Sequence, residues 1–158
     1  MNASPALIGL GSTLHSDEGI GPAVLARVRE RGMAPPGWEL LDLGVAGMGL
    51  LHALAGRPSV VLVDCAYMEC FPGVMRVFDS EQARSVKALA GFSLHEGDLL
   101  NVIALSRTLG ECPPRLKICG IEPADTGPGL RLSRLLEARL DDCAAAVAHL
   151  MGEGRGPC

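Results

Sequence analysis

The 158-residue sequence is poor in aromatic side chains, with three Phe, one Trp and one Tyr. Proteins that bind single-stranded nucleic acid without sequence preference need aromatic platforms on which bases stack. Positive charge is also scarce, because 14 Lys and Arg against 18 Asp and Glu give a formal net charge of -4. A nucleic-acid binder needs a basic surface. We therefore expect no nucleic-acid partner.

Long apolar runs and paired cysteine motifs are missing as well. No charged leader precedes a signal-type apolar core, and no uninterrupted apolar run is long enough to cross a bilayer. The six cysteines include no Cys-x-x-Cys pair, which favours small buried thiols over a thiolate metal site. These absences predict a cytoplasmic protein with reduced cysteines and no membrane insertion.

Several common catalytic motifs are absent. No Gly-Lys-Ser or Gly-Lys-Thr follows a glycine-rich loop, so a P-loop is excluded. Gly9 and Gly11 have the spacing of the first two glycines of a dinucleotide fingerprint, but Leu14 stands in place of the third. A nucleotide-binding module is therefore the last of the alternatives. The sequence has no His-Glu-x-x-His and no Gly-x-Ser-x-Gly, which argues against the commonest zinc protease and serine hydrolase sites.

What the sequence does contain is a regular alternation of strand and helix patterns. Its length suits one domain over residues 1–158. Apolar runs predict strands, and periodic apolar positions predict helices that begin near Pro22 and in three later segments. The strands are expected at 6–10, 38–43, 60–63, 74–78 and 116–121, and the later helices at 50–54, 102–109 and 133–151. This order predicts a three-layer α/β/α sandwich with a mostly parallel sheet and one antiparallel strand. We expect that reversed strand, 74–78, to form a hairpin with its predecessor, because the loop between them is too short for a parallel crossover.

Three chemically active side chains fall at strand ends or in loops of this predicted sheet. Glu18 follows the first strand beside Asp17, Asp64 follows the strand 60–63, and His95 lies in a polar loop. Loops beyond the carboxyl ends of strands form the ligand crevice of an open α/β sheet. One imidazole and two carboxylates on separate elements can hold a first-row divalent ion and leave one side open for water or substrate.

Each of these residues also has an ordinary explanation. Asp17 is more often a cap of the following helix than a metal ligand, although it could also orient a water molecule. Glu18 could interact with the positive end of that helix. Asp64 could cap a turn, and His95 could be a solvated loop residue. His15 is at most an outer partner of the metal site.

Across several separated segments the sequence resembles the hydrogenase maturation proteases, the endopeptidases that trim the C-terminal extension from nickel-iron hydrogenase large subunits. The segments occur in the family's order and span nearly the whole chain: Gly9-Leu10-Gly11, Asp17-Glu18-Gly19-Ile20-Gly21, the turn from Asp42 to Met48, Val63-Asp64, Ser93-Leu94-His95 and Gly120-Ile121-Glu122-Pro123. The resemblance implies a twisted five-stranded sheet between helices. It also implies that Glu18, Asp64 and His95 bind the metal, and that this metal is nickel already installed in the precursor substrate.

On this hypothesis the protein is a metal-dependent peptide hydrolase whose catalytic and metal residues are the same three, Glu18, Asp64 and His95. Two alternatives remain. In the first, Glu18 and Asp64 form an acid/base pair and the ion serves only for recognition. In the second, the protein is a non-catalytic nickel-sensing chaperone of the large subunit.

Two positions depart from the family pattern. Ser12 stands where the family commonly has Asn, and Val45 stands where a small hydroxyl residue is frequent. Neither is expected to bind the metal, so the departures concern how the substrate backbone is held and which hydrogenase is served. The glycine-rich turn from Gly44 to Gly49 can admit an extended peptide, or can simply be a tight connection that needs glycine.

Overall fold

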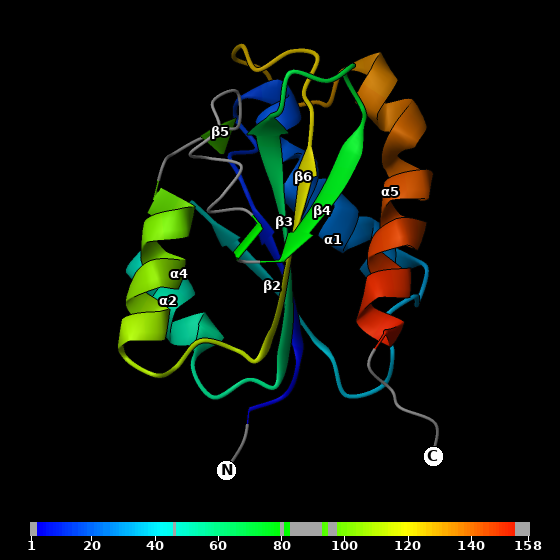
Figure 1. Ribbon diagram of the computed structural model, residues 1–158. Coiled ribbons are helices and arrows are strands. Elements are labelled where there is room, and N and C mark those ends of the chain that lie inside the picture. The colour runs from blue at the N-terminus through cyan, green and yellow to red at the C-terminus, as the bar shows by residue number, and fades with distance from the viewer. Residues whose placement is uncertain (1–2, 46, 80, 83–92, 95–97, 154–158) are drawn as a thin grey trace.

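The computed structural model describes residues 3–45, 47–79, 81–82, 93–94 and 98–153, and its elements follow the predicted order (Figure 1). The strands are β1 (Ala6–Leu10), β2 (Glu39–Gly44), β3 (Ser59–Tyr67), β4 (Met75–Asp79), β5 (Ser93–Leu94) and β6 (Arg115–Ile121). The α-helices are α1 (Ile20–Glu30), α2 (Met48–Leu54), α4 (Asp98–Thr108) and α5 (Arg134–Gly152), and a 3₁₀ turn η1 (Ser16–Gly19) precedes α1.

The sheet has the strand order β2-β1-β3-β6-β4, in which only β4 is antiparallel to its neighbour. Helices α1 and α5 cover one face, while α2 and α4 cover the other (Figure 1). The three-layer α/β/α sandwich with a mostly parallel five-stranded sheet is thereby confirmed. The two residues of β5 add a short antiparallel pairing to the end of β3.

The prediction of a β3–β4 hairpin is wrong in its pairing partner. β4 is reversed, as expected from the short connection, but its residues pair with β6, which lies between β3 and β4. The register Met75↔Ile121 to Asp79↔Lys117 gives β6 two neighbours and buries it in the sheet. The physical reason is that a parallel pairing of β3 with β6, both rich in apolar side chains, takes the position that a hairpin would have used.

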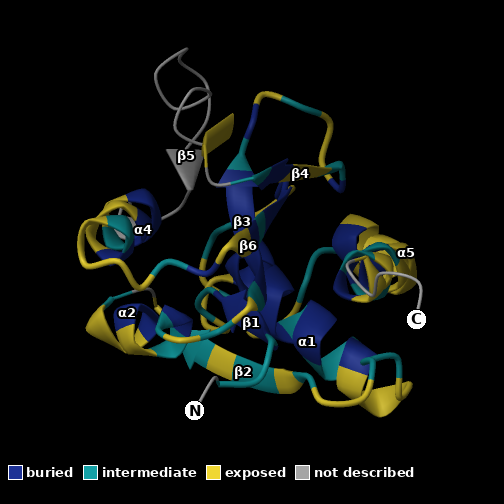
Figure 2. Ribbon diagram, turned by 60° about the horizontal axis from the view of Figure 1, so that its bottom comes forward, coloured by how far each residue is buried: buried dark blue, intermediate teal, exposed yellow. Residues whose placement is uncertain are grey.

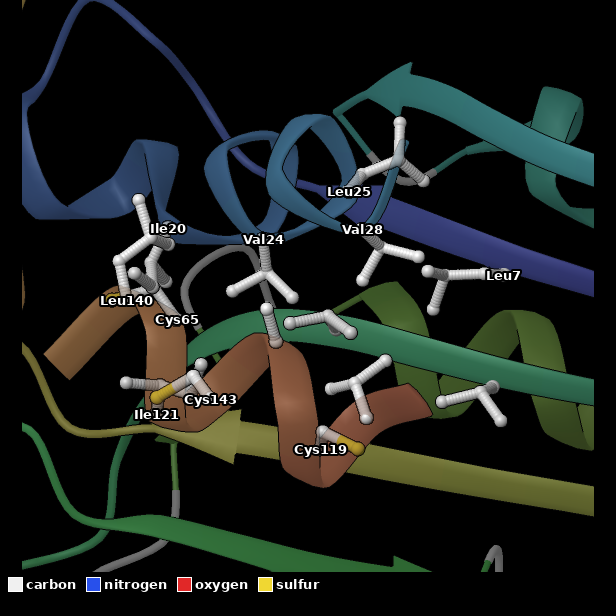
Figure 3. Close-up of a cluster of buried hydrophobic side chains, with 14 of the residues drawn as sticks. Leu7, Ile20, Val24, Leu25, Val28, Cys65, Cys119, Ile121, Leu140 and Cys143 are labelled. Atoms are coloured by element: carbon white, nitrogen blue, oxygen red, sulfur yellow. The ribbon is translucent and has the colours of Figure 1, made fainter. Parts of the chain in front are cut away.

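Two apolar clusters occupy the two faces of the sheet (Figure 2). All five residues of β1 are buried, and so are the seven central residues of β3, as expected for parallel strands covered on both sides. Figure 3 shows the cluster between the sheet and helices α1 and α5, which contains Val24 and Val28 of α1, Cys119 of β6 and Cys143 of α5. These clusters fix the helices against the sheet and so fix the loops between them.

Glycines bring the start of α1 unusually close to the sheet. A Cβ atom built on Gly21 would lie 2.2 Å from the carbonyl oxygen of Leu10 and 2.5 Å from that of Val63. A Cβ on Gly9 would lie 2.8 Å from the carbonyl oxygen of Gly21. All three contacts are with backbone atoms, which cannot swing aside as a flexible side chain can. Gly9 and Gly21 therefore allow α1 to pack closely on the sheet, and this packing places η1 over the ends of β1 and β3.

Within the described residues, no helix is both long enough and apolar enough to pass through a lipid bilayer.

Candidate active site

Glu18 lies in the 3₁₀ turn η1, at the carboxyl edge of the sheet. Its backbone N–H donates to the carbonyl oxygen of His15 at 3.1 Å, and its side chain is only 6% exposed. The carboxylate oxygen Oε2 lies 4.0 Å from Nδ1 of His15, whose ring is about half exposed and also lies 3.1 Å from the Ser12 hydroxyl. Glu18 is thus a nearly buried acid held by a short turn, with His15 and Ser12 on its solvent side.

Asp64 is also nearly buried, with 4% of its surface exposed. The prediction that it follows the end of its strand is wrong, because β3 continues through Tyr67. The extension is stabilised by pairing on both sides: Asp64 and Cys65 pair with Gly120 and Ile121 of β6, and Ala66 and Tyr67 pair with β5. One carboxylate oxygen, Oδ1, accepts the N–H of Cys65 at 2.8 Å. The strand geometry therefore fixes the direction of this side chain.

Gly11 lies between the backbone of Glu18 and the side chain of Asp64. A Cβ atom on Gly11 would lie 1.9 Å from the backbone oxygen of Glu18 and 3.8 Å from Oδ1 of Asp64. Gly11 also has φ +132, a conformation that side chains rarely adopt. The N–H of Gly11 donates to the carbonyl oxygen of Gly44, which ties the end of β2 to the same edge. Segments from β1, β2, β3 and η1 consequently meet around one glycine.

The pKa of the Cys65 thiol reflects the negative charge at this edge of the sheet. Burial raises the pKa of Cys65 well above its ordinary value, and the negative charges of Asp64, Glu18, Asp17 and Glu122 raise it further, in that order. Four acids from three separate segments therefore lie close enough to act on one buried sulfur. Such an edge attracts cations and repels an additional thiolate.

Asp17 is fully buried, and it does not have the capping role predicted for it. It caps neither η1 nor α1, since neither helix start has a side-chain capping bond. Instead, Oδ2 accepts the N–H groups of Ala124 and Asp125, both at 2.9 Å, and Oδ1 accepts that of Ser133 at 2.7 Å. Both oxygens are thus engaged by backbone donors, and the suggestion that Asp17 orients a water molecule stays a prediction.

His95, the predicted imidazole ligand, lies outside the described residues. The residues just before it, Ser93 and Leu94, form β5 and pair with Tyr67 and Ala66 of β3. Among the residues that are described, no three His, Cys, Asp or Glu side chains gather closely enough to hold a metal ion. The structure thus brings Glu18 and Asp64 to one edge and leaves the complete three-ligand set as a prediction.

Two further polar contacts at this edge were not predicted from the sequence. Oε2 of Glu122 accepts the N–H of Met68 just after β3, and the Tyr67 hydroxyl lies 2.7 Å from that of Thr126. Both contacts join the end of β3 to the segment after β6. The only sequence signal was that Glu122 follows a strand directly, since the partners are separated by 54 and 59 residues.

The fold and the buried acids Glu18 and Asp64 near Gly11 define an α/β protein with an acidic candidate active site at the carboxyl edge of its sheet. The family model described as hydrogenase maturation protease (HycI) matches residues 22–150, and the chain therefore belongs to the hydrogenase maturation protease family.

Relatives and solved structures agree with this assignment. The chain is 28% identical over 148 residues to the hydrogenase 2 maturation protease of Escherichia coli, covering 93% of this chain and 90% of that protein. It is 29% identical to the hydrogenase expression/formation protein HupD of Rhodobacter capsulatus, covering 79% of this chain and 61% of HupD. The structure of the hydrogenase maturating endopeptidase HybD from E. coli superposes with a TM-score of 0.83 at 29% identity, covering 98% of this chain and 94% of that one.

Proposed function

We propose that this protein is the endopeptidase that removes the C-terminal extension of a nickel-iron hydrogenase large-subunit precursor after nickel insertion. In this proposal Glu18, Asp64 and His95 recognise the nickel that the precursor carries. The observation that carries the proposal is the meeting of Glu18 and Asp64 around Gly11 in a chain of the hydrogenase maturation protease family.

The chemistry of the two acids suits a metal that arrives with the substrate. Carboxylate oxygens bind divalent first-row ions, but two carboxylates and one imidazole leave several coordination positions open. A free ion would therefore be bound only modestly, whereas an ion already held by a precursor would complete the set on docking. Binding through these residues would then depend on whether nickel insertion has finished.

The surface around the acidic edge also suits a protein substrate. Large exposed apolar side chains follow β1, β2, β3 and β6, four of them in loops and Met48 at the start of α2: Leu14, Val45, Met48, Phe71 and Leu130. Exposed apolar residues grouped around a polar centre are typical of interaction surfaces. From the end of β2 to the first turn of α2, a Cβ on Gly44, Gly47 or Gly49 would meet no atom within 4 Å, so a peptide backbone could approach there.

In the reaction, a water oxygen bonds to the scissile carbonyl carbon and the bond from that carbon to the peptide nitrogen breaks. One proton of the water goes to the departing amine, and the new carboxylic acid on the mature subunit loses the other proton to that amine or to solvent, which leaves a carboxylate. The Glu18 and Asp64 carboxylates hold the precursor through its nickel ion, so that one peptide bond is presented to water beside the turn at Gly44. If the acids instead transfer the protons themselves, turnover on a precursor peptide persists under rigorous chelation.

The test follows C-terminal shortening of nickel-loaded and nickel-free precursor by intact mass. We expect cleavage of the loaded form only, and a loss of at least about a hundredfold in Glu18→Gln or Asp64→Asn. The exposed acid Asp142 of α5 provides the control variant Asp142→Asn, which should cleave normally. Unchanged cleavage in Glu18→Gln would refute the assigned role. Binding of loaded precursor with no change of mass would select the chaperone alternative.

A further inference from the structure

Asp17 joins two loops that are far apart in the sequence. Its side chain accepts three backbone N–H groups from the segment between β6 and α5, and its own N–H donates to the carbonyl oxygen of Asp125 at 2.9 Å. A fully buried carboxylate is costly unless its oxygens are hydrogen-bonded. All three donors to the side chain are backbone N–H groups, so these hydrogen bonds depend on the conformation of the loop and not on which side chains it carries.

The residues beside Asp17 extend the same seam. Ser16 donates its N–H to the carbonyl oxygen of Gly129 and its hydroxyl to that of Gly127, both at 2.9 Å. Gly129 in turn donates to the carbonyl oxygen of Leu14 at 3.0 Å. We call the hydrogen-bonded contact of residues 14–17 with residues 124–133 the loop seam. It fixes the chain on the N-terminal side of Glu18 to the start of α5.

The turn that carries Glu18 needs such an anchor. Ser16 has φ 52, a strained conformation for a residue other than glycine, and such strain persists only where the surroundings hold it. The turn η1 is four residues long and has no side-chain cap, so little within it resists rearrangement. Its direction is instead set on one side by Gly11 and on the other by the loop seam.

We propose that Asp17 is a positioning residue for Glu18. By clamping η1 to the segment before α5, it holds the Glu18 carboxylate beside Asp64 at the separation that a shared ion requires. That positioning Glu18 serves nickel binding rests on the proposed function, but the effect of Asp17 on the conformation of η1 does not. Residues that orient metal ligands typically change metal affinity by about 10- to 100-fold when they are altered.

The decisive variant is Asp17→Asn, which keeps the size of the side chain but replaces one acceptor oxygen by an NH₂ group. The NH₂ group cannot accept a hydrogen bond from a backbone N–H, so at least one of the three hydrogen bonds to the side chain is lost. We expect the backbone amide of Glu18 to exchange its hydrogen at least about tenfold faster by NMR. In a calorimetric titration of the full chain with nickel chloride, we expect the Kd to rise by at least about tenfold.

The matched control is Ser133→Ala. The Ser133 hydroxyl caps α5 by accepting the N–H of Leu136 at 3.3 Å, and its loss weakens the start of that helix. The backbone N–H that Asp17 accepts is retained in this variant. Ser133→Ala should therefore lower stability while leaving both the exchange rate of the Glu18 amide and the nickel Kd unchanged. Equal effects in Asp17→Asn and Ser133→Ala would reduce Asp17 to a general stabiliser and overturn the proposal.

The exchange measurement keeps this proposal separate from the proposed function. If the wild-type chain binds no nickel and Glu18→Gln cleaves normally, the function fails, while faster exchange at Glu18 in Asp17→Asn still establishes the positioning role. Unchanged exchange at Glu18 overturns that role whatever the activity. Should Asp17→Asn not fold, Ser16→Ala removes one bond of the loop seam and should change both readouts in the same direction, by about two- to fivefold. No change in either readout would overturn the proposal there.

Discussion

Cys119 is a buried thiol whose ionisation should be visible in the stability of the protein. It lies in β6 with no exposed surface, facing helix α5 (Figure 3). Burial, and to a smaller extent the neighbouring Cys143, raise the pKa of Cys119 from 9.0 to about 12. Below about pH 9 the thiol is neutral in both the folded and the unfolded chain, so its full contribution to stability is present there.

We predict that Cys119 makes the protein less stable as the pH rises above 9. Between about pH 9 and 12 the unfolded chain ionises this thiol and the folded chain does not, which costs about 1.4 kcal/mol per pH unit. The measurement is urea denaturation of wild type and Cys119→Ala over this pH range. The difference between their free energies of unfolding should shrink with that slope. Parallel pH curves would show that the thiol is not protected from ionisation.

Asp17 shows what the sequence conveys at the scale of a residue and what it does not. The pair Asp17 and Glu18 after the first strand marked an acidic edge, and the structure places Glu18 there beside Asp64. The separate role of Asp17 could not be predicted, because its three hydrogen-bond donors lie 107, 108 and 116 residues away along the chain. Local rules for helix caps consider only the following turn.

At the scale of elements, the contact of α1 with β1 and β3 depends on a missing side chain. We predict that Gly21→Ala lowers the free energy of unfolding by about 3 kcal/mol, because its Cβ would be pressed against the carbonyl oxygens of Leu10 and Val63. The control is Gly49→Ala in α2, where a Cβ would meet no atom within 4 Å and should add up to about 1 kcal/mol of stability. The measurement is urea denaturation followed by circular dichroism.

An equal response of the two glycine variants would contradict the close packing of α1. Gly21→Ala also bears on the acidic edge, because Gly21 is the second residue of α1, which begins directly after η1 ends. Displacement of α1 by Gly21→Ala should move η1 with it. Gly21→Ala should then lose affinity for nickel-loaded precursor, whereas Gly152→Ala at the end of α5, where a Cβ would also meet no atom within 4 Å, should keep it.

A helix or strand could be predicted from the sequence where the residues that determine it lie close together along the chain. The bounds of β1 and the stripe of Val24, Leu25 and Val28 in α1 follow from apolar runs and helical spacing within a dozen residues. The pairing of β4 was not predictable in the same way, because its partner β6 begins 40 residues after β4 does. For the same reason the end of β3 was placed too early, since its last residues are held by pairing with β5 and β6.

At the scale of the whole molecule, the exposed apolar loops around the acidic edge predict where a protein substrate docks. We expect the double variant Leu14→Ser with Leu130→Ser to raise KM for loaded precursor by about five- to tenfold and to change kcat little, since each side chain is exposed and carries no group that can transfer a proton. Leu109→Ser is the matched control, because Leu109 is also exposed but lies past the end of α4. Steady-state cleavage kinetics measure both constants, and an equal effect of the control would contradict a specific docking face.

The central claim is that one nickel ion is bound jointly by side chains from separate segments of the chain. The most direct measurement is X-ray diffraction from nickel-soaked crystals at the nickel absorption edge. The account predicts a single strong anomalous peak about 2.0–2.2 Å from carboxylate oxygens of both Glu18 and Asp64, with the His95 imidazole as the third ligand. A peak that contacts neither acid, or no peak at this edge while other sites are filled, would contradict it.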